Sequence, residues 1–236
     1  VITVCIGIVT AILIILQFDI SVKNQVSYEE NQAVYTAKPY EQKKEKENFQ
    51  ENANSDICSW ITIPGTNINY PVCQGTDNEY YLTHDVNGNE NIYGAIFLDY
   101  QSNQEDLNKV IYGHNMGAGS DEMFSSLISY ENSEWYSEHR IIQYVDNGDK
   151  QAYKIFAVMN FDINNLSEFD YMQRNFDSQT FEEWLLYIKK HSLYNYDVDV
   201  KYGDELITLS TCNRKLGEDN RLVVFSVKER GEDEGK

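Results

Sequence analysis

The hydrophobic and polar positions of this 236-residue chain alternate over short runs, which predicts a mainly β domain. Turn-forming pairs such as Pro64-Gly65 and Asn147-Gly148 separate several of these runs. Closely spaced strands with such turns favour a β-barrel or sandwich over a parallel α/β sheet. The expected strands, rich in β-branched and aromatic residues, are 59–63, 68–73, 92–98, 109–112, 140–145, 151–161, 206–212 and 221–225.

Helical patterns mark a few segments between these strands, so the expected fold class is mainly β with helices (α+β). Asp77 to Leu82 predicts one helical turn, Ser120 to about Ile128 a short helix, and 133–138 a second one. A capping-box pattern at 180–183 then begins a segment with a stripe of large apolar residues at helical spacing. The stripe consists of Phe181, Trp184, Leu185 and Ile188. We expect this helix to pack on the core.

The apolar pattern also divides the chain into four regions. Residues 1–18 are almost uninterruptedly apolar, which predicts a single-pass anchor in the cell membrane with the rest of the chain outside. A cleaved signal peptide is disfavoured because no small-residue cleavage site follows, and a buried core helix because the run has no polar face. Residues 19–56 predict a charged helical spacer, 57–228 the folded domain and 229–236 a disordered tail.

Charge and cysteine usage narrow the function classes. A formal net charge of −19 speaks against nucleic acid as a partner, because phosphates require a basic surface. The four cysteines show neither a CxxC pattern nor Cys/His pairs at zinc-finger spacing, so no metal or organic cofactor is implied. Cys58 and Cys73 lie among apolar neighbours. Buried free thiols are their expected state, and a disulfide bridge between them is the alternative.

The last two strands present a candidate for nucleophilic chemistry. If they pair antiparallel, Cys212 ends the first and Arg221 begins the second, within roughly 5 to 8 Å of each other. A nearby guanidinium favours the reactive thiolate and could hold a carbonyl or oxyanion. Ser210 shares the face of Cys212 and is a candidate for contact with a substrate. The alternative is that Cys212 is a small buried hydrophobe and Arg221 a solvated charge.

Six sequence motifs strengthen the catalytic interpretation, because together they resemble the class B sortases. Sortases are membrane-anchored cysteine transpeptidases that attach proteins to the cell wall of Gram-positive bacteria. The likeness extends from about Trp60 to Val227, and the sequence departs from the family where Asn213 and Arg214 replace a common acidic residue after the cysteine. The matching motifs are Trp60 to Thr66, Tyr70-Pro71-Val72, Asp77 to Leu82, Gly94 to Asp99, Val110 to Met116, and Thr208 to Cys212 with Arg221.

The resemblance implies an eight-stranded sortase barrel with N-terminal helices and a helix in the long connection before the cysteine strand, where that connection forms one wall of a substrate groove. It implies His114, Cys212 and Arg221 as catalytic residues, with Asn78 and Leu82 lining the groove. The implied partners are secreted proteins with a C-terminal sorting motif and an amine of a peptidoglycan peptide.

The expected reaction is cleavage of the sorting signal after Thr through a thioacyl-enzyme, followed by transfer to the peptidoglycan amine. A cysteine endopeptidase that passes the acyl group to water would use the same residues. A non-catalytic envelope module that binds wall polymers through its tyrosines is the alternative from another class, and it would need no reactive thiol at Cys212.

Overall fold

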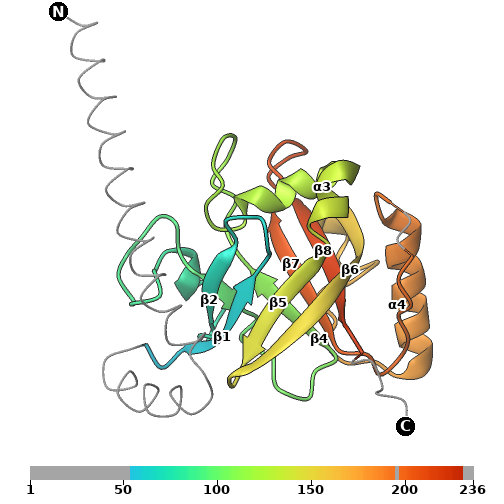
Figure 1. Cartoon of the computed structure of the whole chain (residues 1–236). Coiled ribbons are helices and arrows are strands. Elements are labelled where there is room, and N and C mark those ends of the chain that lie inside the picture. Colours follow the sequence, from blue (N-terminus) through green and yellow to red (C-terminus); the bar gives the residue numbers. More distant parts are fainter. Residues whose placement is uncertain (1–53, 195–196, 231–236) are drawn as a thin grey trace, which may run out of the picture.

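The computed structural model describes residues 54–194 and 197–230. Within these residues, eight strands close into a barrel in the order β1-β2-β3-β4-β7-β8-β6-β5 (Figure 1). The predicted eight-stranded barrel is thereby confirmed. The strands are β1 (Ile57–Thr62), β2 (Asn69–Cys73), β3 (Ile96–Leu98), β4 (Asn108–Tyr112), β5 (Ile141–Asp146), β6 (Asp149–Asp162), β7 (Leu206–Cys212) and β8 (Asn220–Lys228).

Several predictions fall on residues that the structure does not describe. The membrane anchor at 1–18, most of the spacer at 19–56 with its N-terminal helices, and most of the tail at 229–236 lie outside the described ranges. Among residues 54–194 and 197–230, no helix is long and apolar enough to cross a membrane. The anchor, the spacer and the tail therefore stay predictions.

The pairing of β4 with β7 determines which chain ends meet. These two strands run parallel, as do β2 and β3, whereas the other neighbouring strands run antiparallel. A parallel pair cannot be joined by a tight turn, so the chain between them makes a long crossover. That crossover carries β5, β6 and the helix α4 (Ser178–His191). As a result, the carboxyl ends of β4 and β7 lie at the same end of the barrel.

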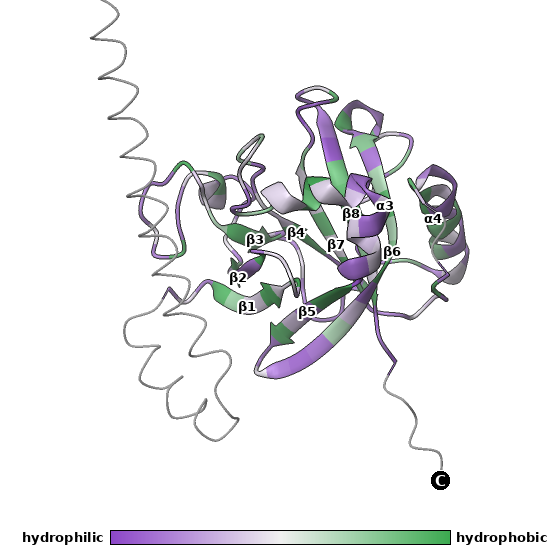
Figure 2. Cartoon of the chain, turned by 45° about the horizontal axis from the view of Figure 1, so that its top comes forward, coloured by the Kyte–Doolittle hydropathy of each residue, from purple (hydrophilic) through white to green (hydrophobic). Residues whose placement is uncertain are grey.

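Side-chain alternation along the strands builds two cores. Ile207 and Leu209 point into the barrel and join its interior cluster. Leu206 and Phe225 point outward into a second cluster, which α4 covers with its predicted stripe, now buried. Trp184 of α4 packs edge-on against Phe225, with ring centroids 5.6 Å apart. In Figure 2, the hydrophobic positions of α4 lie on the side that faces β6.

Element boundaries differ from the prediction in several places, and the helical turn expected at Asp77 to Leu82 is the shorter 3-10 turn η1 (Tyr80–Leu82). The strand expected at 92–98 is reduced to β3, because the chain turns at Gly94 with φ +59° and passes so close to the preceding loop that a Cβ there would lie 2.3 Å from the Tyr81 carbonyl oxygen. The helix α4 begins earlier than predicted, since the Asp177 side chain accepts a hydrogen bond from the backbone N–H of Thr180. The helix expected at 120–128 is instead the 3-10 helix η2 (Ser125–Glu131). The predicted helix at 133–138 is confirmed as α3 (Ser133–Glu138).

The outer core makes a testable contribution to stability. Replacing Trp184, which is 4% exposed, by alanine removes its contacts in the outer cluster and the hydrogen bond from its Nε1 to the Asp170 carbonyl. We expect Trp184→Ala to lower the free energy of unfolding by about 3–5 kcal/mol, measured by urea denaturation. Leu186→Ala on the same helix is the matched control, because Leu186 is 68% exposed and should cost no more than about 0.5 kcal/mol. Equal losses for the two variants would contradict this account of α4.

Candidate active site

Cys212 and Arg221 are direct cross-strand partners at the end of the β7–β8 ladder. Both residues are partly exposed, and both point to the outer face of the barrel, since they alternate with the interior residues Thr211 and Leu222. The Arg221 Nη1 donates to the backbone carbonyl oxygens of Glu218 (2.8 Å) and Asn220 (3.1 Å), which orient the guanidinium. The predicted pairing of the two residues is confirmed.

His114 reaches the same end of the barrel through β4. Tyr112 pairs with Ser210 in the parallel ladder, so His114 and Cys212 each lie two residues beyond that pair. Two side-chain hydrogen bonds join the segments that follow: Asn115 Nδ2 donates to the Cys212 carbonyl oxygen (2.8 Å), and Thr211 Oγ1 donates to the Gly113 carbonyl oxygen (2.8 Å). The fold therefore brings together all three predicted catalytic residues.

A hydrogen bond sets the orientation of the imidazole. The Nε2 atom of His114 lies 2.7 Å from the carbonyl oxygen of Leu82. A carbonyl oxygen only accepts, so Nε2 carries a hydrogen in this arrangement. Leu82 belongs to the 3-10 turn η1 (Tyr80–Leu82), and its side chain is 38% exposed. This turn, predicted to line a groove, thus contacts the histidine through its backbone.

Asn78, the other residue predicted to line the groove, is held by the protein itself. Its Nδ2 donates to the carboxylate of Asp99 (2.9 Å), and its Oδ1 accepts from the backbone N–H of Tyr100 (3.0 Å). Because an amide group has two N–H donors and an oxygen with two lone pairs, half of its hydrogen-bonding capacity remains for a ligand. The side chain of Asn78 is consequently fixed before any substrate arrives.

Ser210 lies on the face of Cys212, as predicted, but it is 3% exposed. The hydroxyl groups of Ser210 and Tyr171 are 3.1 Å apart and share a hydrogen bond. Burial raises the pKa of the Tyr171 hydroxyl, while the bond to Ser210 and the nearby Arg221 oppose that rise. Tyr171 therefore stays protonated at neutral pH. The sequence analysis missed this residue, because it lies in the irregular connection between β6 and α4.

Asn213, the residue that departs from the family pattern, is completely buried. Its Nδ2 donates to Glu131 Oε1 (2.8 Å) and to Asn160 Oδ1 (2.7 Å). Its backbone N–H donates to the Asn220 carbonyl oxygen (2.8 Å). A carboxylate is thus present beside this position, but η2 contributes it through Glu131. These bonds fix the chain immediately after the cysteine.

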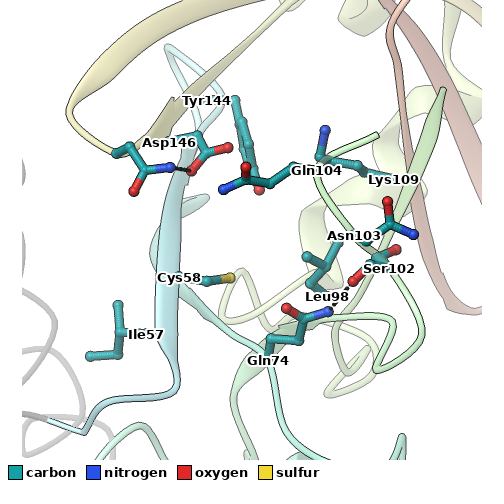
Figure 3. A pocket seen from close by; sticks show the side chains of 11 residues that line it. Ile57, Cys58, Gln74, Leu98, Ser102, Asn103, Gln104, Lys109, Tyr144 and Asp146 are labelled. Atoms are coloured by element: carbon teal, nitrogen blue, oxygen red, sulfur yellow. Dashed lines mark hydrogen bonds between the residues drawn. The ribbon is translucent and has the colours of Figure 1, made fainter. Parts of the chain in front are cut away.

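A cavity of about 280 Å³ lies at the opposite end of the barrel and contains none of the predicted site residues (Figure 3). Cys58 and Lys109, which line it, lie near the starts of β1 and β4, whereas His114 and Cys212 lie at the far ends of β4 and β7. Burial raises the pKa of the Cys58 thiol to about 11 and that of Cys73 further. Both cysteines are free, as expected, and the described residues hold no cluster of three metal-ligating side chains.

Comparisons with known proteins show which family this chain belongs to. A family model described as "Sortase domain" matches residues 61–229. Sortase B of Listeria monocytogenes is 36% identical over 178 residues, which cover 74% of this chain and 70% of that protein. Sortase B of Staphylococcus aureus is 32% identical over 181 residues, which cover 75% of this chain and 72% of that protein.

Solved structures give the same result. The structure of Clostridium perfringens sortase B superposes on this chain with a TM-score of 0.72 at 30% identity. The superposition covers 78% of this chain and 100% of the sortase B chain. A substrate complex of Staphylococcus aureus sortase B superposes with a TM-score of 0.73 at 27% identity, over 89% of this chain and 98% of that one. The chain belongs to the sortase family of cysteine transpeptidases. Its similarity to sortase B proteins over most of its length places it in class B.

The three described cysteines should differ sharply in reactivity. Cys58 and Cys212 are both partly exposed and Cys73 is buried. Burial of the thiol raises the pKa of Cys58 and of Cys73, so both hold their protons at pH 8, whereas Cys212 lies beside the guanidinium of Arg221. We expect iodoacetamide at pH 8 to alkylate Cys212 first in the native protein, as followed by peptide mass spectrometry. Cys58 and Cys73 should react only after denaturation. Labelling of Cys58 at the rate of Cys212 would contradict this assignment.

Proposed function

We propose that this protein is a transpeptidase that cleaves a C-terminal sorting signal after Thr and transfers the protein to an amine of a peptidoglycan peptide. The convergence of His114, Cys212 and Arg221 at one end of the barrel is the observation that carries the proposal. An activated nucleophile, an acid–base group and an oxyanion donor are the three parts that acyl transfer requires.

In the first half of the reaction, the Cys212 thiolate attacks the carbonyl carbon of the Thr residue. A C–S bond forms, and the C–N bond breaks when the tetrahedral intermediate collapses. The imidazolium of His114 gives its proton to the departing amine, and Arg221 stabilises the oxyanion. The Leu82 carbonyl, which accepts a hydrogen bond from His114 Nε2, supports this role because it orients the ring and leaves Nδ1 as the nitrogen that gives and takes the proton.

In the second half, an incoming amine attacks the thioester. His114 takes a proton from that amine, a new C–N bond forms, and Cys212 leaves as the thiolate. One relative supports an amine as the nucleophile, since a sortase B has been solved in complex with triglycine. The groove proposed for the sorting peptide lies at the partly exposed ends of β4 and β7, between the η1 turn and the β6–α4 connection.

The proposed location follows from the apolar run at 1–18. A membrane anchor there would hold the catalytic domain, at 57–228, outside the cell near newly secreted proteins and the growing wall. Gram-positive bacteria, which attach proteins to peptidoglycan, are the expected setting.

Turnover with and without an amine tests the proposal directly. The chain from residue 27 onward, with a folded state verified by circular dichroism, would be incubated with fluorogenic peptides that carry Thr at the cleavage position. We expect an acyl adduct on Cys212 by mass spectrometry, and faster release when triglycine is added. Cys212→Ala should abolish cleavage. Release by water alone would instead indicate an endopeptidase, and no adduct with any peptide would indicate a binding module.

Arg221 should act through the geometry of its planar fork and not through charge alone. We expect Arg221→Lys to reduce kcat by about a hundredfold to a thousandfold, because lysine cannot reproduce the directed N–H donors. Arg214→Lys is the matched control, since Arg214 is an exposed arginine in the loop between β7 and β8 and should keep full activity. Measured kcat values within twofold for all three proteins would refute an oxyanion role for Arg221.

A further inference from the structure

A single carboxylate connects the two sides of the proposed groove. Asp99 directly follows β3 and is 6% exposed. Its side chain accepts hydrogen bonds from three segments that are far apart in the sequence, in addition to one from its own turn. The donors are Asn78 Nδ2 (2.9 Å), Tyr112 OH (3.1 Å), Arg174 Nη1 (3.2 Å) and the backbone N–H of Gln101 (3.0 Å).

Arg174 extends this connection to a second carboxylate. Its Nε lies 3.6 Å from Asp106 Oδ2, and the Asp106 side chain is completely buried. The neighbouring Asn175 donates to Asp106 Oδ1 (2.7 Å), and Arg174 Nη1 also donates to Gln101 Oε1 (2.9 Å). Hydrogen bonds in which one partner is ionised are stronger than those between neutral groups. The β6–α4 connection is therefore attached firmly to the loop between β3 and β4.

The two segments that Asp99 joins, the one that leads into η1 and the β6–α4 connection, lie on either side of the end of the sheet that carries Cys212. The η1 side contributes Asn78 and Leu82, and Leu82 contacts His114 through its carbonyl. The β6–α4 side contributes Tyr171, which bonds Ser210 two residues before Cys212. Tyr112 lies between them on β4, opposite Ser210. Burial, reinforced by Asp99, raises the pKa of the Tyr112 hydroxyl, so it stays protonated and donates to Asp99.

We propose that Asp99 and Arg174 are positioning residues that set the spacing between the two walls of the peptide groove. The inference rests on the function proposed above. Neither residue needs to touch the reacting atoms, because each acts through Asn78 and the Tyr171 segment. A small displacement of a wall changes how well a peptide fits, so these residues determine the affinity for the sorting peptide more than the chemical step.

Arg174→Lys is the principal test, because lysine keeps the positive charge beside the two carboxylates but loses the fork that joins them. We expect the KM for the sorting peptide to rise about tenfold, with kcat within about twofold of wild type. Asn78→Ala should also raise KM. Since both act through Asp99, the double variant should have a KM no higher than that of the worse single variant. A double variant whose rise in KM equals the product of the two single rises would overturn the proposal, as would an unchanged KM in Arg174→Lys.

Controls separate positioning from simple loss of folding. Arg230→Lys is the matched variant, because Arg230 pairs with Asp199 and Asp204 outside the proposed groove and should leave KM unchanged. The melting temperature and the rate of Cys212 alkylation should show that Arg174→Lys is folded with an intact thiol. If Arg174→Lys does not fold, Tyr112→Phe takes its place, because it removes only one hydrogen bond to Asp99. It should raise KM, and combined with Asn78→Ala it should give a KM no higher than that of the worse single variant. Wild-type protein that turns over no peptide refutes the proposed function itself, whereas an active wild type with insensitive variants refutes only the positioning role.

Discussion

The parallel pairing of β4 with β7 is the constraint on which the candidate site depends. It makes two strands distant in the sequence end side by side, so that His114 and Cys212 follow the same pair of residues. Parallel neighbours require a long crossover, and here the crossover includes β5, β6 and α4. The antiparallel partner β8 then contributes Arg221 from the other side of β7. One central strand, β7, thereby brings the thiol of Cys212 near the imidazole of His114 and the guanidinium of Arg221.

Alternation along β7 separates the stabilising role of the strand from its chemical role. Ile207 and Leu209 point into the barrel and are completely buried, which fixes the register of the strand. Ser210 and Cys212 point outward, toward Tyr171 and the partly exposed end of the sheet. A slip of one residue would turn the thiol into the interior and the apolar side chains outward. The barrel core therefore determines on which face the Cys212 thiol lies.

The sequence was sufficient for features that depend on local pattern, and insufficient for those that depend on distant contacts. Strand alternation and the turn between the last two strands predicted the pairing of Cys212 with Arg221, and helical spacing predicted the buried stripe of α4. Tyr171 and Arg174 could not be found in this way, because they lie in an irregular connection without periodicity. Arg174 meets Asp99 across 75 positions of sequence, a contact that only the closed barrel creates.

The departure from the family pattern after the cysteine has a physical explanation of the same kind. The side chain at 213 lies on the opposite face of the strand from Cys212 and donates two hydrogen bonds, one of them to the Glu131 carboxylate. An acidic residue at this completely buried position would place a second carboxylate against Glu131, where like charges repel strongly. Asparagine supplies N–H donors in nearly the same volume. The identity of residue 213 is thus coupled to the carboxylate that η2 contributes, and the backbone beside Cys212 stays fixed.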